Sequence, residues 1–252
     1  MSSKARNKFK ERIGEIKILQ KYVDSITATT ELERKRESAI HRASLVMLCS
    51  HFEGYVEDRL LEFIDDVKFS KVQCIKIPPQ LKVSLCKPGL KKLENKDHNV
   101  LIDRIPRFIE QYTVIWDNDK VLAPKDFPVI DDDDWKIGNP GSKVLERNFK
   151  RIGIDKIWQE IDSKNGTLKR DLDALVQRRN EIAHGNIDST ATSVDVERYV
   201  KSISELIGRL DAITYRHFHN VTSLSPDGLR SLIESYYSIM IMNLLNVKPV
   251  WS

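Results

Sequence analysis

The chain has 252 residues, of which 40% are hydrophobic and 31% are charged, and its formal net charge is +4. This length suits one large domain, and this composition can fill a hydrophobic core, which argues against a disordered chain. The excess of positive charge is compatible with a polyanionic partner. However, the basic clusters at the N-terminus and at residues 34–36 are more simply explained as solvated helix faces.

A membrane protein and a secreted disulfide scaffold are both disfavoured. No apolar run approaches the roughly 18 residues needed to span a bilayer, and the polar, basic start does not resemble a signal peptide. Cys49, Cys74 and Cys86 are too few and too widely spaced for a disulfide framework or a zinc site, and Cys49 is expected in the core. We therefore expect a cytoplasmic protein that needs no metal and no cofactor.

Helical periodicity begins at once. Apolar residues recur at helical spacing over residues 4–24 and again over 32–67, where the absence of proline predicts one long helix or two stacked end to end. The centre of this second segment is apolar on more than one face, which is typical of the central helix of a bundle. Residues 68–97 contain prolines and lysines without a clear period, so we expect irregular structure with one short helix at most.

A helical stretch is predicted at 98–115, followed by a surface loop rich in proline and glycine that contains four aspartates at 131–134. Such a run is more often solvated than bound to a cation. We interpret residues 68–141 as an insertion within a single domain, 1–252. Further helices are predicted beyond the insertion, at 142–151, 154–162, 168–184, 194–218 and 226–246. No segment alternates with a period of two, so the sequence predicts an all-α helical bundle.

One stretch of the helix at 168–184 is unusual. In "LVQRRNEIAHGN", helical spacing places Arg179 on the same stripe as Leu172 and Leu175. A guanidinium keeps its charge when buried, so it needs an anionic partner or a bound anion. Glu53, on an apolar stripe of the long helix, is a candidate partner. An internal salt bridge without any chemistry explains this pattern equally well.

His184 favours a chemical role for the same stretch. It follows Asn180 by four residues, so both lie on nearly one face, and the amide can orient the imidazole. Arg179 lies about 140° away around the helix, so the two could converge by the reach of arginine or across a symmetry axis. Histidine suits proton transfer near neutral pH and arginine suits phosphate, a pair that fits metal-free RNA cleavage by the ribose 2′-OH. DNA lacks that nucleophile.

Three segments resemble a known family. "RRNEIAHG" resembles the signature of the HEPN superfamily, in which arginine and a polar residue precede histidine. "SLVMLCSHFEGYVEDRL" is similar to the early long helix of its MAE-type branch, and "SKVLERNFKRIGID" is similar to the stretch that this branch carries before the signature helix. The resemblance covers residues 30–67 and 142–215 well, but the insertion 68–141 and the C-terminal helix poorly.

The resemblance implies a bundle that dimerises and forms a composite, metal-independent endoribonuclease site. Arg179 would bind the scissile phosphate, His184 would take part in proton transfer, and Asn180 would orient them. Glu53 would hold Arg179, and Arg178 would be a solvated or RNA-backbone contact. Such proteins commonly act as toxins of toxin–antitoxin pairs or in phage defence, which implies a possible antitoxin or regulatory protein.

Two alternatives stay open: a catalytically silent HEPN module that binds nucleotide, RNA or a partner protein, and a helical scaffold in which Arg179 forms a structural ion pair. Some members are silenced by nucleotidylation of a tyrosine two residues after the histidine; this chain has Asn186 there, which disfavours that regulation. Among the other histidines, we expect His51 to be packed or partly exposed rather than catalytic, and His217 and His219 to lie at the surface rather than to bind metal.

Overall fold

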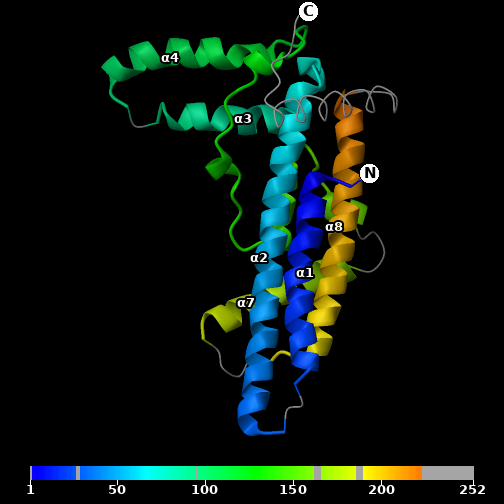
Figure 1. The fold of residues 1–252 in the computed structure, drawn as a ribbon. Helices are drawn as coiled ribbons and strands as arrows, with labels where there is room; N and C mark the ends of the chain where they lie inside the picture. Colours follow the sequence, from blue (N-terminus) through cyan, green and yellow to red (C-terminus); the bar gives the residue numbers. More distant parts are fainter. Residues whose placement is uncertain (1, 27–28, 95, 162–165, 186–189, 223–252) are drawn as a thin grey trace, which may run out of the picture.

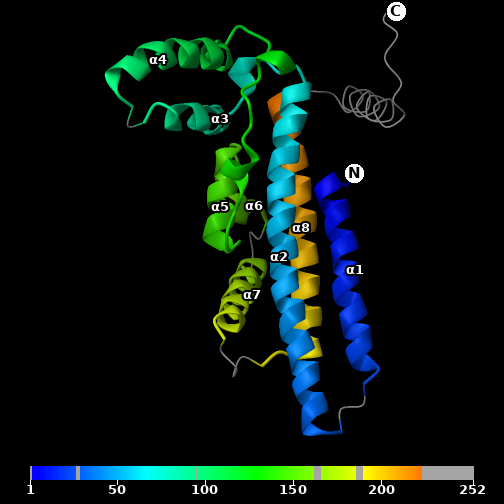
Figure 2. The same cartoon turned by 60° about the vertical axis from the view of Figure 1, so that its left-hand side comes forward.

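Three long helices run side by side along the body of the molecule: α1 (Lys4–Asp24), α2 (Glu31–Phe69) and α8 (Ser193–Thr222) (Figure 1). The computed structural model describes residues 2–26, 29–94, 96–161, 166–185 and 190–222, and it contains no β-strand within these ranges. Shorter helices lie on the side of α2 that faces away from α1 (Figure 2); they are α5 (Ser142–Arg151), α6 (Ile157–Ile161) and α7 (Thr167–Ala183). The all-α bundle predicted from periodicity is therefore confirmed.

The central position of α2 follows from its sequence. It is one continuous helix, and its buried residues include Leu45, Phe52, Val56 and Phe63 on more than one face, as the apolar pattern predicts. A capping box fixes its start: the Thr30 hydroxyl accepts the backbone N–H of Glu33, and the Glu33 carboxylate accepts the backbone N–H of Thr30. Hydrogen bonds that the N–H and hydroxyl groups of Thr30, and then those of Thr29, donate to the Glu33 carboxylate lower the pKa of Glu33 to about 2.

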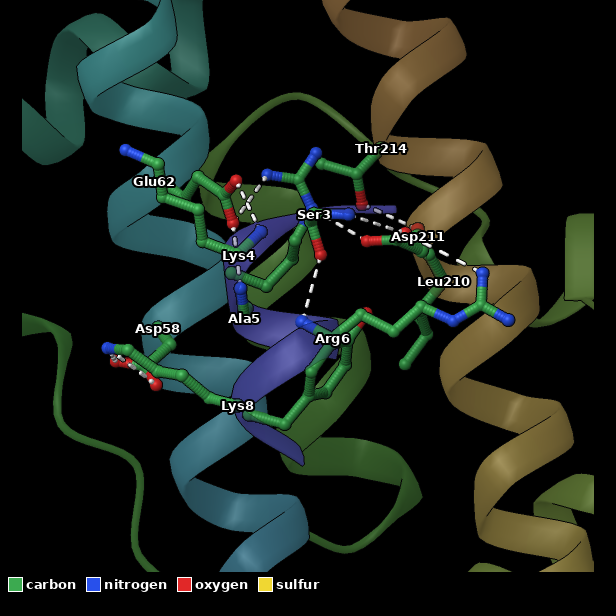
Figure 3. A network of polar contacts seen from close by, with 12 residues as sticks. Ser3, Lys4, Ala5, Arg6, Lys8, Asp58, Glu62, Leu210, Asp211 and Thr214 are labelled. Carbon is green, nitrogen blue, oxygen red and sulfur yellow. Dashed lines mark hydrogen bonds and ion pairs between the residues drawn. The ribbon is translucent and has the colours of Figure 1, made fainter. Parts of the chain in front are cut away.

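The start of α1 is held between the other two long helices (Figure 3). Glu62 of α2 accepts the backbone N–H groups of Lys4 at 3.0 Å and Ala5 at 3.2 Å, and Asp211 of α8 accepts that of Ser3 at 3.1 Å. Two carboxylates thus bind the N–H groups that the first turn of a helix leaves without an intrahelical partner.

Arg59 compensates the charge of these carboxylates. Its Nε lies 3.5 Å from Oδ1 of Asp211 and its Nη1 lies 3.8 Å from Oε2 of Glu62, distances of ion pairs rather than of short hydrogen bonds. Arg59 and Asp211 are each only 4% exposed. Because both charges are removed from water, each depends on the other for compensation.

Residues 68–141 form an arm and, over residues 117–141, a returning segment that runs back along the body. Helices α3 (Pro79–Lys91) and α4 (His98–Thr113) extend from the end of α2, away from the body (Figures 1 and 2), and confirm the one short helix and the helical stretch expected there. Four short 3-10 helices complete it, η1 (Cys74–Lys76), η2 (Val114–Trp116), η3 (Pro124–Asp126) and η4 (Asp132–Trp135).

The returning segment is not the simple surface loop that its prolines and aspartates suggested. Trp135 and Ile137 are buried against the body, and the backbone N–H of Ile137 donates to Oε1 of Glu57 on α2 at 2.7 Å. The Arg151 guanidinium of α5 lies 3.6 Å from the centre of the Trp135 ring. The expectation of a surface loop overlooked these two buried apolar side chains, which lie only two residues apart in the sequence.

Helices α5, α7 and α8 begin and end close to their predicted limits, whereas α6 is shorter than expected. The helix predicted at 226–246 lies outside the described residues. Among the residues described, no helix combines the length and apolar character needed to cross a membrane.

Candidate functional site

The helix α7 carries the signature stretch and packs against α2 and α8. Its buried residues are Leu168, Leu172, Leu175 and Val176, the stripe that its periodicity predicts. Gly185, at φ +78°, lets the chain leave the helix in a left-handed conformation that favours glycine. The helix therefore ends directly after the polar residues of its last turns.

Arg179 is half-buried at the end of this stripe. Its Nη1 donates to Oδ1 of the neighbouring Asn180 at 3.1 Å. No carboxylate of the described residues lies within 4.0 Å of its guanidinium, so it forms no direct salt bridge there. A guanidinium has five N–H donors in a planar fork, and the single bond to Asn180 leaves most of them for other acceptors.

Glu53 and Arg179 form no salt bridge with each other, but their charges are close enough to interact. Burial raises the pKa of Glu53 above its ordinary value, the nearby Glu57 carboxylate raises it further, and Arg179 lowers it. Arg179 and Glu53 also act on the same thiol: burial raises the pKa of Cys49 to about 11, Arg179 opposes this increase and Glu53 adds to it. The structure therefore brings Cys49, Glu53 and Arg179 together, with Cys49 in the core as expected.

His184 is the residue at which α7 ends. Its backbone N–H donates to the Asn180 carbonyl at 2.9 Å, and its side chain is exposed. Arg179, Asn180 and His184 thus lie on the last turns of one helix, the first two in direct contact and the imidazole open to solvent. Such a set offers cationic N–H donors and a titratable ring at one helix end, with the guanidinium and the imidazole on different sides of the helix.

Arg178 is anchored to α8. Its Nη1 lies 3.2 Å from Oδ1 of Asp195, and its Nη2 donates to the backbone carbonyl of Thr190. Arg178 and Asp195 are both half-buried. These contacts tie the end of α7 to the start of α8, and the expectation that Arg178 is a solvated or RNA-backbone contact stays a prediction.

Sequence reasoning missed two carboxylates that position this region. Glu57 follows Glu53 by one helical turn; it repels the Glu53 charge and binds the backbone of the returning segment. Asp173 of α7 accepts the backbone N–H of Ser142 at 2.8 Å and its hydroxyl at 2.7 Å, and thus binds the start of α5. The i,i+4 spacing from Glu53 could have indicated Glu57, whereas nothing local indicates the contact of Asp173.

Two further histidines, His51 and His217, pack against neighbouring helices. His51 is packed as expected, with its Nε2 3.4 Å from Oε2 of Glu15 on α1. The expectation that His217 lies at the surface is wrong: its ring stacks on Phe63 with centroids 5.5 Å apart, and its Nε2 lies 2.9 Å from the Ile152 carbonyl. Burial lowers the pKa of His217, although the Ile152 contact opposes this shift.

Cation ligands do not gather in the part of the chain that the structure describes. No group of three or more histidine, cysteine, aspartate or glutamate side chains there could hold a metal ion. Within the aspartate run, Asp133 pairs with Lys136 at 2.6 Å and Asp134 pairs with Lys91. Asp133 is exposed, whereas the Asp134 side chain is only 10% exposed, so the aspartate run is solvated only in part.

Comparison with known proteins identifies a family whose model matches most of this chain. A family model described as RiboL-PSP-HEPN matches residues 7–215, which is more than half of the chain; the match includes most of α1, all elements from α2 to α7 and most of α8. No curated protein and no solved structure gives a significant match.

Proposed function

Because the chain belongs to the RiboL-PSP-HEPN family, a HEPN family, we propose that it is a metal-independent endoribonuclease whose site is formed by Arg179, Asn180 and His184. The observation that carries this proposal is the state of Arg179. It is half-buried beside Glu53 and Cys49, yet it makes no direct salt bridge with any carboxylate of the described residues. A phosphate group can supply the anionic partner that the protein does not.

The proposed chemistry is transfer of the phosphoryl group to the ribose 2′-OH. The 2′-oxygen loses its proton and attacks the adjacent phosphorus, and the bond from phosphorus to the 5′-oxygen of the next nucleotide breaks. Arg179 would stabilise the negative charge that develops on the non-bridging oxygens. His184 would transfer a proton to or from one of the two ribose oxygens. Asn180 would fix the orientation of the guanidinium through the contact that it already makes.

One protomer offers one guanidinium and one imidazole on different sides of a helix end. We propose that two copies pair about a two-fold axis, so that two such sets face one RNA strand. Proton transfer to the leaving oxygen and proton removal from the attacking oxygen need two groups in the same cleft, and a second copy supplies the second histidine. Isologous pairing brings the same surface of each protomer together.

An intracellular nuclease needs restraint, and we therefore propose a role as a toxin of a toxin–antitoxin pair or as a phage-defence effector. Support comes from the HEPN family membership and from the absence of a catalytic metal in the proposed chemistry, because such a nuclease would be active as soon as it is folded. A dedicated antitoxin or regulatory protein would then be required in the host.

The test is cleavage of total RNA by purified wild-type protein and by the His184→Ala variant, in the presence and absence of EDTA. We expect the wild type to cleave equally in both buffers and the variant to lose at least about 100-fold in rate, the range of a lost acid–base group. Intact RNA with wild-type protein would refute the nuclease function and favour a silent binding module. Cleavage that EDTA abolishes would refute the mechanism alone.

A further inference from the structure

Three cations form an exposed stripe on α5. Lys143, Arg147 and Lys150 follow one another at spacings of four and three residues, so they lie on one face of the helix, and all three are exposed. The opposite face of α5, with Leu145 and Phe149, is buried. The stripe is thus fixed toward solvent by the packing of the same helix.

Among the residues that the structure describes, this stripe has no carboxylate partner, a state that it shares with the exposed Lys10, Lys17 and Lys21 of α1; it differs from them in lying on the side of α2 that carries α7 (Figure 2). Elsewhere on the surface, Lys8 pairs with Asp58, Lys35 with Glu31, and Arg209 with Glu205. Within the described ranges no acidic oxygen lies within 4.0 Å of the three α5 cations; the exposed Glu146, three residues after Lys143 and four before Lys150, lies on the same face without such a contact and leaves that face with a net positive charge. Unpaired cations at helical spacing leave a positive potential that an extended polyanion can use.

The stripe is held rigidly beside the candidate site. Asp173 of α7 binds both the N–H and the hydroxyl of Ser142, and the Trp158 indole donates to the Ser142 carbonyl at 3.0 Å. Figure 2 shows α5 above α7 on the same side of α2, whereas α1 lies on the other side. A ligand bound at the end of α7 can therefore continue along α5 without crossing the bundle.

Distances along the helices agree with a strand of several nucleotides. At 1.5 Å per residue, about 16 Å of α7 separates Asp173 from His184, and the α5 stripe extends for about another 10 Å. The exposed residues of α5 are charged and present no large apolar side chain. This composition suits contact with phosphates, whereas a docked protein requires a buried apolar or aromatic centre.

We propose that Lys143, Arg147 and Lys150 bind the phosphate backbone of single-stranded RNA and guide it toward Arg179 and His184. The inference rests on the proposed nuclease function and adds the surface that carries substrate affinity. It assigns the affinity for RNA to α5 and the cleavage of RNA to the end of α7. Because the contacts are to the backbone, they provide no base specificity.

The experiment measures binding without cleavage, in the His184→Ala variant, with a fluorescent single-stranded RNA and anisotropy over a range of salt concentrations. Lys143→Gln, Arg147→Gln and Lys150→Gln are combined in one chain. We expect affinity to fall by more than about tenfold at low salt. The slope of log affinity against log salt should decrease by about 2, because each lost contact to a single strand removes about 0.7.

The matched control combines Lys10→Gln, Lys17→Gln and Lys21→Gln. These three lysines are exposed on α1, which lies on the other side of α2 (Figure 2), and their removal changes the net charge equally. The inference predicts a nearly unchanged salt slope for this control, with circular dichroism showing that both triple variants fold. Equal losses in both, or none in the α5 variant, would overturn the inference alone. Failure of the His184→Ala parent to bind any RNA would overturn the proposed function as well.

Discussion

A half-buried guanidinium beside a carboxylate that it does not contact is an unusual local arrangement. The pKa of Glu53 is raised, with burial as the largest cause, so the attraction of Arg179 does not compensate the cost of placing that charge there. A structural salt bridge would show the opposite balance. The arrangement therefore agrees better with an arginine that has kept its capacity for an external anion.

The first prediction concerns the shape of the Arg179 side chain. We expect Arg179→Lys to lower the rate of RNA cleavage about 100-fold, because lysine keeps the charge but loses the planar fork that binds two phosphate oxygens and contacts Asn180. Single-turnover cleavage measures the effect. Arg170→Lys, on the exposed face of the same helix, is the control and should cleave as the wild type does. Full activity of Arg179→Lys would show that only charge matters.

The second prediction concerns Glu53 and pH. Because its folded-state pKa lies above the ordinary value of 4.5, the folded protein binds this proton more tightly than the unfolded chain does. The contribution of Glu53 to stability is therefore greatest at low pH and declines as the pH rises from about 4.5 through the raised pKa. Glu53→Gln should remove this decline, and its free energy of unfolding relative to the wild type should be higher at pH 7 than at pH 4.

Urea unfolding at both pH values tests this prediction, and RNA cleavage is measured in parallel. We expect the stabilised Glu53→Gln protein to cleave more slowly, because the negative charge that holds the Arg179 side chain near the cleft is gone. A variant that is instead less stable at pH 7 than at pH 4, relative to the wild type, would show that Glu53 and Arg179 form a favourable ion pair in solution.

The sequence predicted some of this arrangement and not the rest. Helical spacing alone placed Arg179 and Glu53 on apolar stripes of two helices that must pack together. It gave no information on the distance between their charged groups, which depends on how α7 and α2 cross. The i,i+4 spacing could place Glu57 beside Glu53, but it could not reveal the bond of Glu57 to the Ile137 backbone, which joins residues 80 positions apart.

At the scale of elements, helix limits were predictable wherever the sequence contains recognisable capping residues. Thr30 and Glu33 define the start of α2, and Gly185 follows the end of α7. The arm was less predictable, because the packing of α3 on α4 depends on a single small residue. A Cβ atom at Gly89 would lie 2.5 Å from Cε2 of Tyr112 and 2.9 Å from Cδ2 of Phe108, so only glycine permits this close approach.

The third prediction follows from that contact. Gly89→Ala should displace the Tyr112 ring and destabilise the arm by about 1–3 kcal/mol, the usual range for overpacking. Of the 16 residues of α4 only Tyr112 is buried, so this helix should lose amide protection in hydrogen exchange while α2 and α8 keep theirs. Gly138→Ala, where a Cβ meets nothing within 4 Å, is the control. Unchanged protection in α4 would contradict the prediction.

The fourth prediction tests the network that joins three helices at the start of α1. Asp211→Ala removes the acceptor of the Ser3 N–H and leaves the buried Arg59 with Glu62 as its remaining ion-pair partner among the described residues. We expect the free energy of unfolding to fall by about 3–5 kcal/mol, as for other broken buried pairs. Glu31→Ala, which breaks the exposed pair with Lys35, should cost at most about 1 kcal/mol. Similar costs in urea unfolding would show that the network contributes little.

At the scale of the whole molecule, the two sides of the bundle have different roles. One side carries α1, whose first turn is fixed by carboxylates of α2 and α8 (Figure 3). The other carries α5 and α7, joined through Ser142 and Asp173. The long helices could be predicted as a bundle, but their periodicity contains no information on which side the shorter helices cover. That distribution leaves the end of α7 and the α5 stripe open on the same side.

The fifth prediction tests whether two copies share one cleft. Wild-type and Arg179→Ala, His184→Ala double-variant chains are co-expressed with different tags, and the mixed dimer is purified through both. Two independent sites would leave one intact site and half of the wild-type rate. A shared cleft needs groups from both protomers, so the mixed dimer should cleave RNA at well under half of that rate. A rate of one half, or a protein that stays monomeric at micromolar concentration, would exclude the composite site and leave each Arg179–His184 set to act alone.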